Sequence, residues 1–183
     1  MSIEVRNTET VKTAPGADSG VGTQILVFAE ALLLSIWLGS MVFFSFAVAP
    51  SAFGVLPSRH LAGQVVASTI AKVEMIGLAA GALLLALQLT LWRTGQANRR
   101  IRAARMLSLI VMILATAGMR FWISPTMVAL RASMGRPIDE IDPADPLRTQ
   151  FNDLHQYSVI LMAIAMLAGV VFLFLSVKSW LRR

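Results

Sequence analysis

The sequence has no cysteine and few charged residues, which make up 14% of its 183 positions. The absence of cysteine excludes disulfides, thiolate metal sites and cysteine nucleophiles. Charge is missing altogether between Ala31 and Ser58, and a helix needs only about 20 apolar residues to cross a bilayer. With 56% hydrophobic residues, the composition is that of an integral membrane protein rather than of a soluble domain.

The 16 basic residues outnumber the 10 acidic ones, but they flank apolar segments instead of forming one patch. This placement predicts the lipid bilayer, and not a nucleic acid, as the main partner. No nucleophile–base pair, paired carboxylates or phosphate-binding loop is visible. We therefore expect a non-enzymatic protein without a cofactor.

Apolar segments predict an all-α bundle of four transmembrane helices. Pro50, which has no backbone donor, is expected to end the first helix, and residues 58–72 are expected to lie at the membrane interface. Residues 1–23 are polar and small, which predicts a disordered cytoplasmic tail. The membrane domain would then cover 24–183, with helices at about 24–49, 74–92, 106–124 and 154–177.

Basic residues also predict the orientation. Five arginines between Arg93 and Arg105 join the second and third expected helices, whereas five acids lie in the segment 126–153 between the third and fourth. Because cytoplasmic loops are enriched in Lys and Arg, we expect both termini to be cytoplasmic, in a bacterial inner membrane.

Two short stretches hint at an internal duplication. The first expected helix ends at residues 48–51 (VAPS) and the third at 123–126 (ISPT), with an offset of 75 residues. Two parallel hairpin repeats would produce this offset, as in known membrane folds. A match of four positions also arises by chance.

Small residues recur at the spacing of close helix contacts. Ser35 and Gly39 share this spacing on the first helix. Either a seam inside the bundle or an oligomer interface would use such residues. The candidates for helix packing are Gly77, Gly81, Ala165 and Gly169.

Arg120 is the charged residue that fits a helix end least well. Only 14 residues separate it from Arg105, about 21 Å of helix against a hydrocarbon core of roughly 30 Å. It is expected either to pair with an acid, which would fix helix positions, or to line an outer-face cavity for an anionic or polar ligand. The members of this outer-face polar cluster are Arg120, Glu74, Asp153, His155 and Arg59.

Metal ligands are scarce. The two histidines, His60 and His155, lie in contexts typical of helix ends, and no HxxxH or HExxH spacing occurs. Met162 and Met166 are one turn apart, but methionine is an ordinary core residue. We expect no metal site.

Several stretches together resemble the transmembrane protein 205-like family. These are residues 37–39 and 42–46, then 48–50, 53, 55–57, 59 and 62–63, and later 124–125, 127–131, 151–155 and 158. The resemblance implies a four-helix membrane protein without an established enzyme activity. Unlike that family, this chain has no aromatic and proline-containing segment before its second helix. The family-motif positions are Trp37, Gly39, Phe44, Pro50, Gly63, Pro125, Phe151 and Ser158.

Three functions remain open from the sequence. The first is a membrane protein of the export or envelope systems that binds a small polar ligand or a partner through its outer-face polar cluster. The second is a haem- or copper-binding redox protein. The third is a structural accessory subunit, either a homo-oligomer or bound to other membrane proteins.

Overall fold

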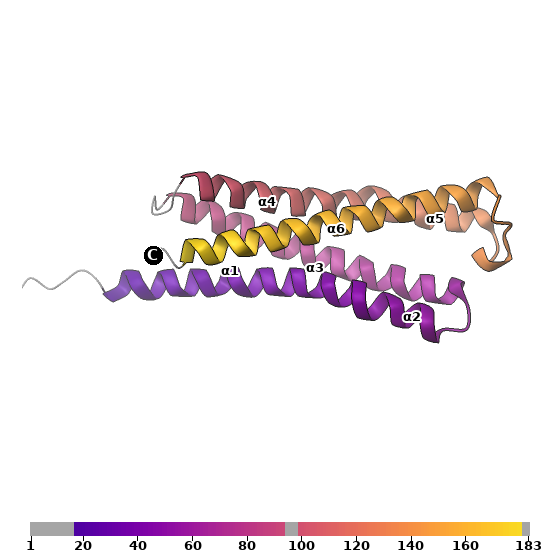
Figure 1. The fold of residues 1–183 in the computed structure, drawn as a ribbon, viewed down its shortest axis with the longest axis horizontal. Helices are drawn as coiled ribbons and strands as arrows, with labels where there is room; N and C mark the ends of the chain where they lie inside the picture. Colours follow the sequence, from indigo (N-terminus) through magenta and orange to yellow (C-terminus); the bar gives the residue numbers. More distant parts are fainter. Residues whose placement is uncertain (1–16, 94–98, 181–183) are drawn as a thin grey trace, which may run out of the picture.

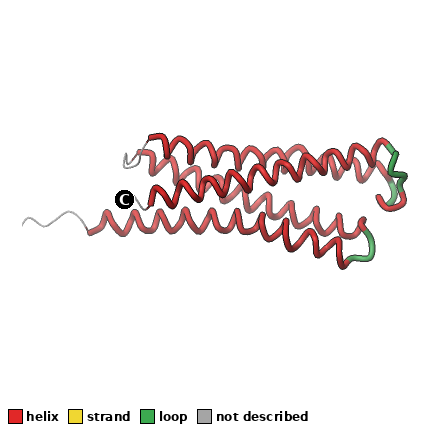
Figure 2. Tube along the Cα trace, viewed as in Figure 1, coloured by secondary structure: helices red, strands yellow, loops and turns green. Residues whose placement is uncertain are grey.

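The computed structural model describes residues 17–93 and 99–180, and none of these residues is in a strand. Long helices run side by side along one axis (Figures 1 and 2), so the predicted all-α bundle is confirmed. The elements are α1 (Ala17–Phe43), the π-helical turn η1 (Phe44–Val48), α2 (Ala49–Val55), α3 (Arg59–Arg93), α4 (Arg99–Gly118), the π-helical turn η2 (Met119–Ile123), α5 (Ser124–Met134), the 3₁₀ turn η3 (Ile138–Glu140) and α6 (Pro146–Trp180).

The first helix continues through Pro50, where the sequence predicted its end. Ahead of the proline the backbone widens into η1, and the N–H of Ala49 bonds to the carbonyl of Phe44, five residues back. A proline in a regular helix lacks its own donor and clashes with the carbonyl four residues earlier. The wider turn makes room for the ring, so α1, η1 and α2 form one bent helix.

Pro125 is accommodated in the same way. The N–H of Ser124 bonds to the carbonyl of Met119 across η2, and α5 then continues the helix to Met134. Each π turn therefore precedes a proline at the start of the next helix. Such turns are known to mark functional sites within helices.

The second long helix also differs from the prediction. Residues 59–72 belong to α3, which begins near the loop rather than at residue 74. Its first turn is capped by Ser58, whose Oγ accepts from the N–H of Leu61 at 3.2 Å, and by Asp139, whose carboxylate accepts from the N–H of His60 at 3.1 Å. The second cap comes from a distant loop, which sequence spacing does not reveal.

The expected tail lies only partly within the described chain. Residues 17–23 form the first turns of α1, whereas residues 1–16 lie outside the described residues. The start of α1, the end of α3, the start of α4 and the end of α6 lie at one end of the bundle (Figure 1). We call this the inner end and the opposite one the outer end.

Four helices are long and apolar enough to cross a membrane: Gly20–Val55, Arg59–Thr90, Arg99–Met134 and Pro146–Trp180. Their outward faces carry large apolar side chains, including Phe46 and Phe121, which are 76% and 74% exposed. Apolar surface on this scale is stable only against lipid. The protein is a multi-pass membrane protein.

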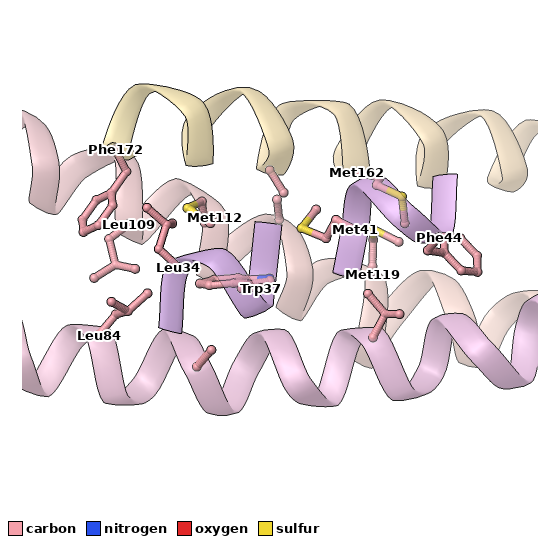
Figure 3. Packing of buried hydrophobic residues seen from close by; sticks show 14 residues of the cluster. Leu34, Trp37, Met41, Phe44, Leu84, Leu109, Met112, Met119, Met162 and Phe172 are labelled. Carbon is pink, nitrogen blue, oxygen red and sulfur yellow. The ribbon is translucent and has the colours of Figure 1, made fainter. Parts of the chain in front are cut away.

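Part of the buried core follows a regular spacing that gives five layers, each with one residue from each of the four spans. Within each helix these buried positions are separated alternately by three and four residues, the spacing of a coiled-coil seam. Figure 3 shows the apolar layers around Trp37. From the inner end, the layers are Glu30, Gln88, Arg105 and Ser176; Leu34, Leu84, Leu109 and Phe172; Trp37, Gly81, Met112 and Gly169; Met41, Gly77, Thr116 and Ala165; and Phe44, Glu74, Met119 and Met162.

The same layers relate the two halves of the chain. Each layer residue in α1 or η1 corresponds to a layer residue 75 positions later, in α4 or η2. Each layer residue in α3 corresponds to a layer residue 88 positions later, in α6. The two π turns also start 75 residues apart. The two hairpins thus share the spacing of these five layers and the place of the π turn, in addition to the four positions that match in sequence.

Candidate functional site

The first and the last of the five layers each contain a buried acid; we call them the inner and the outer polar layer, and the inner one holds an ion pair. Glu30 and Arg105 are 0% and 2% exposed, and their side chains form a salt bridge. Ser176 on α6 donates a hydrogen bond to the same Glu30 oxygen at 2.6 Å. The Arg105 guanidinium also lies 5.5 Å from the ring centre of Phe172, a favourable cation–π distance. The pair therefore joins α1, α4 and α6.

Sequence reasoning missed this pair because both residues were placed at helix ends. Enough uncharged residues follow Glu30 to span a bilayer without it, and Arg105 lies in the arginine-rich segment between the second and third expected helices. In the structure Glu30 lies well inside α1, and Arg105 lies in the second turn of α4. The 75-residue offset was the available signal, because it relates these two opposite charges directly.

The outer polar layer contains Glu74, which is 2% exposed in the middle of α3. Its Oε1 accepts a hydrogen bond from the Ser124 hydroxyl at 2.9 Å, and its Oε2 is buried without a partner. Arg120 in η2 interacts electrostatically with Glu74. Within the described chain these two side chains do not reach the 4.0 Å of an ion pair. Glu74 is thus a buried acid with one carboxyl oxygen that has no hydrogen-bond partner.

Glu74 and Arg120 are the members of the predicted outer-face polar cluster that the structure brings together. Asp153 and His155 are exposed on α6, seven to nine residues from Met162 in the Glu74 layer, which is about 10–14 Å along the helix. Arg59 is exposed at the start of α3, about 22 Å from Glu74 along the same helix. The five residues do not form one cluster. Ser124, which the sequence did not single out as a ligand of Glu74, joins the site instead.

Trp37 packs into the groove left by two of the small residues. A Cβ on Gly81 would lie 3.0 Å from the Trp37 ring, and one on Gly77 would overlap its indole nitrogen. Trp37 itself is 0% exposed. The GxxxG spacing of α3 therefore receives a side chain of α1, since the missing side chains let the indole approach the backbone.

The corresponding residues of α6 are also inside the bundle. Ala165 is 0% exposed, and a Cβ on Gly169 would lie 3.1 Å from Leu38 and 3.2 Å from Met112. Ser35 and Gly39 share the spacing but face outward, and a Cβ on Gly39 would meet nothing within 4 Å. The four residues Gly77, Gly81, Ala165 and Gly169 are buried within the chain, so they expose no surface that a neighbouring subunit would contact.

The remaining family-motif positions have structural contacts. Phe44 lies in the Glu74 layer, and Pro50 and Pro125 follow the π turns. Arg131 lies 5.2 Å from the ring centre of Phe151 and closely approaches the backbone of Gly63. Ser158 donates to the His155 carbonyl within α6 at 2.7 Å. Nothing in these contacts forms a second polar site.

Metal-binding groups are dispersed in the described part of the chain, where no three His, Asp or Glu side chains come together. His60 lies 3.1 Å from the amide nitrogen of Gln64 near the start of α3. The Met162 sulfur accepts a hydrogen bond from Ser45 at 3.0 Å. The His60 Nε2 and the Met162 sulfur thus have protein partners, whereas the His60 Nδ1 is buried without one.

Comparison with known proteins identifies the family. Residues 32–136 match the family described as Domain of unknown function (DUF4149), which is more than half of the chain. The chain belongs to this family. The DUF4149 match includes Trp37, Glu74, Arg120 and Ser124, but it excludes Glu30 and all of α6. No curated protein and no solved structure matches the chain, and the resemblance to the transmembrane protein 205-like family stays a prediction.

Proposed function

We propose that this protein binds a small cationic solute with hydrogen-bond donors at Glu74, within a bacterial inner membrane. The observation that supports this function is that Oε2 of Glu74 has no hydrogen-bond partner, although Glu74 is only 2% exposed. Buried polar atoms normally have partners, and charged residues inside membrane bundles mark ion or substrate pathways. Such a site performs recognition rather than catalysis.

The rest of the site limits the class of solute. A carboxylate oxygen without a partner accepts hydrogen bonds and favours positive charge nearby, so the solute carries an N–H or O–H donor. Phe44, Met119 and Met162 occupy the same layer and are buried, so the surroundings are apolar. We therefore replace the expected anionic or polar ligand with a small cation that carries hydrogen-bond donors.

The proposed orientation places the inner end of the bundle in the cytoplasm. Arg99, Arg100 and Lys178 lie exposed at that end, in agreement with the positive-inside rule. The acidic loop around η3 then faces the opposite side, and a solute reaches Glu74 from there. A role in an export or envelope system remains our proposal.

The direct test measures the thermal unfolding of the purified protein with ammonium, methylammonium and guanidinium chloride, against equal sodium chloride. A ligand present at 100 times its Kd stabilises the native state by about 2.7 kcal/mol. We expect at least one of these cations to raise the Tm of the wild type and to leave Glu74→Gln unchanged.

Glu30→Gln is the matched control, because it removes a buried acid of the same type from the inner layer. Its Tm should still rise with the same cation. If no cation shifts the wild type, or if the shift survives in Glu74→Gln, the proposed function is wrong.

A further inference from the structure

The two buried acids of the bundle differ in how their charge is compensated. The Glu30 carboxylate has the Arg105 guanidinium and the Ser176 hydroxyl on its Oε1. The Glu74 carboxylate has only the Ser124 hydroxyl on its Oε1, with no ion pair among the described residues. Both are at most 2% exposed. Burial is therefore equal, whereas the compensating charge is present at one acid and absent at the other.

An uncompensated buried charge is expensive, and a carboxyl group avoids this cost by taking up a proton. A hydrogen bond to one oxygen recovers only part of the lost hydration. Glu74 is about two turns from the Trp37 layer, roughly 10 Å along α3, with apolar side chains filling its own layer. These conditions favour the neutral acid at Glu74.

The charged groups around Glu74 do not change this balance. On its own helix Lys72 is exposed, and the nearest cation on the packed elements is Arg120 in η2, which is half-exposed. The segment 31–58, which includes η1 and α2, has no charged residue. The other charged residues and the histidines on these elements and on α6 lie nearer the ends of the bundle: Asp18 and Glu30 on α1, Arg59, His60 and Arg93 on α3, Arg99, Arg100, Arg102 and Arg105 on α4, Arg131 on α5, Asp139 and Glu140 on η3, and Arg148, Asp153, His155 and Lys178 on α6.

We propose that Glu74 is a proton-binding site inside the membrane. The proton occupies Oε2, the oxygen without a partner, and needs no cavity there. Oε1 keeps the hydrogen bond from Ser124, the first residue after η2, so gain or loss of the proton acts directly on the π-helical bend. This inference rests on the proposed function, in which Glu74 is the binding group, and it names the proton as the competitor of the cation.

The test uses N,N′-dicyclohexylcarbodiimide, an apolar reagent that modifies protonated carboxyl groups in membranes. The acid adds across one C=N bond, with its proton going to nitrogen and its oxygen to carbon, and the O-acylisourea rearranges to a stable N-acylurea. Full-length protein in lipid vesicles is treated from acidic to alkaline pH, and peptides are analysed by mass spectrometry. We expect an adduct on Glu74 that is lost as the pH rises, and none on Glu30.

Two pairs of variants test the environment of the site. Arg120→Gln removes the nearby positive charge, which favours the neutral acid, so labelling of Glu74 should persist to higher pH. Arg136→Gln, in the loop, should leave the profile unchanged. Ser124→Ala removes the hydrogen bond to Oε1 and should also extend labelling to higher pH, whereas Ser133→Ala, whose hydroxyl bonds to its own helix, should not.

The outcomes separate the two proposals. Labelling of Glu74 without any cation-induced rise in Tm supports the proton site and contradicts the proposed function. A rise in Tm that requires Glu74, without labelling at acidic pH, contradicts the proton site alone. Equal labelling of Glu30 and Glu74 also overturns the inference, because it removes the difference in charge compensation.

Discussion

Glu30 and Arg105 form a buried ion pair between equivalent positions of the two halves of the chain. They are 75 residues apart, the offset that also relates η1 to η2 and the buried residues of α1 to those of α4. The two halves therefore meet at the inner end through opposite charges at positions related by this offset. Neither hairpin alone contains both charges.

The first prediction concerns this pair. Arg105→Ala should lower the free energy of unfolding by about 3–5 kcal/mol, because it leaves the Glu30 carboxylate buried without its counter-charge. The exchange Glu30→Arg with Arg105→Glu should recover part of this loss, since the two positions are equivalent. Chemical unfolding in mild detergent measures the difference. An exchange that is worse than both single variants would contradict the equivalence.

The second prediction concerns the contact between Trp37 and α3. Gly77→Ala should cost about 1–3 kcal/mol, because the new methyl group overlaps the indole nitrogen and the packed ring has little room to move. Gly39→Ala is the control, since its methyl group meets nothing within 4 Å and alanine favours the helix. Thermal unfolding of both variants should show a loss only for Gly77→Ala.

The third prediction concerns Arg120. Because Arg120 and Glu74 are not within ion-pair distance, Arg120→Ala should cost less than Arg105→Ala. A double-mutant cycle with Glu74→Gln should give a coupling below that of the Glu30–Arg105 cycle. The same cycle with Asp153→Asn should give no coupling, because Asp153 is exposed about two turns further out. A coupling with Asp153 would show that α6 is displaced relative to η2.

The fourth prediction concerns topology. Reporter fusions at Arg183 and within the loop 136–146 should report opposite sides of the membrane, with Arg183 cytoplasmic. Agreement between the two reporters would contradict the crossing of the membrane by α6. If each reporter gave the opposite side to the one expected, the four-helix bundle would stand, but Glu74 would lie in the cytoplasmic half of the membrane.

The prolines show why the helix ends were poorly predicted. Pro50 and Pro125 were expected to end helices, because a regular helix cannot accept the ring. Both are accommodated by a π turn just before them. Whether a helix bends or stops there depends on the packing that stabilises the wider turn. The sequence contains the proline but not this packing.

The sequence by itself determined the four apolar spans, the polar ends and the 75-residue offset, because these depend on residue type and spacing along one chain. Only the tertiary structure decided which charges are buried. Glu30 and Glu74 both precede long apolar runs, yet one faces Arg105 and the other faces Ser124. That difference depends on the rotation and depth of neighbouring helices, and it separates a structural ion pair from a candidate binding site.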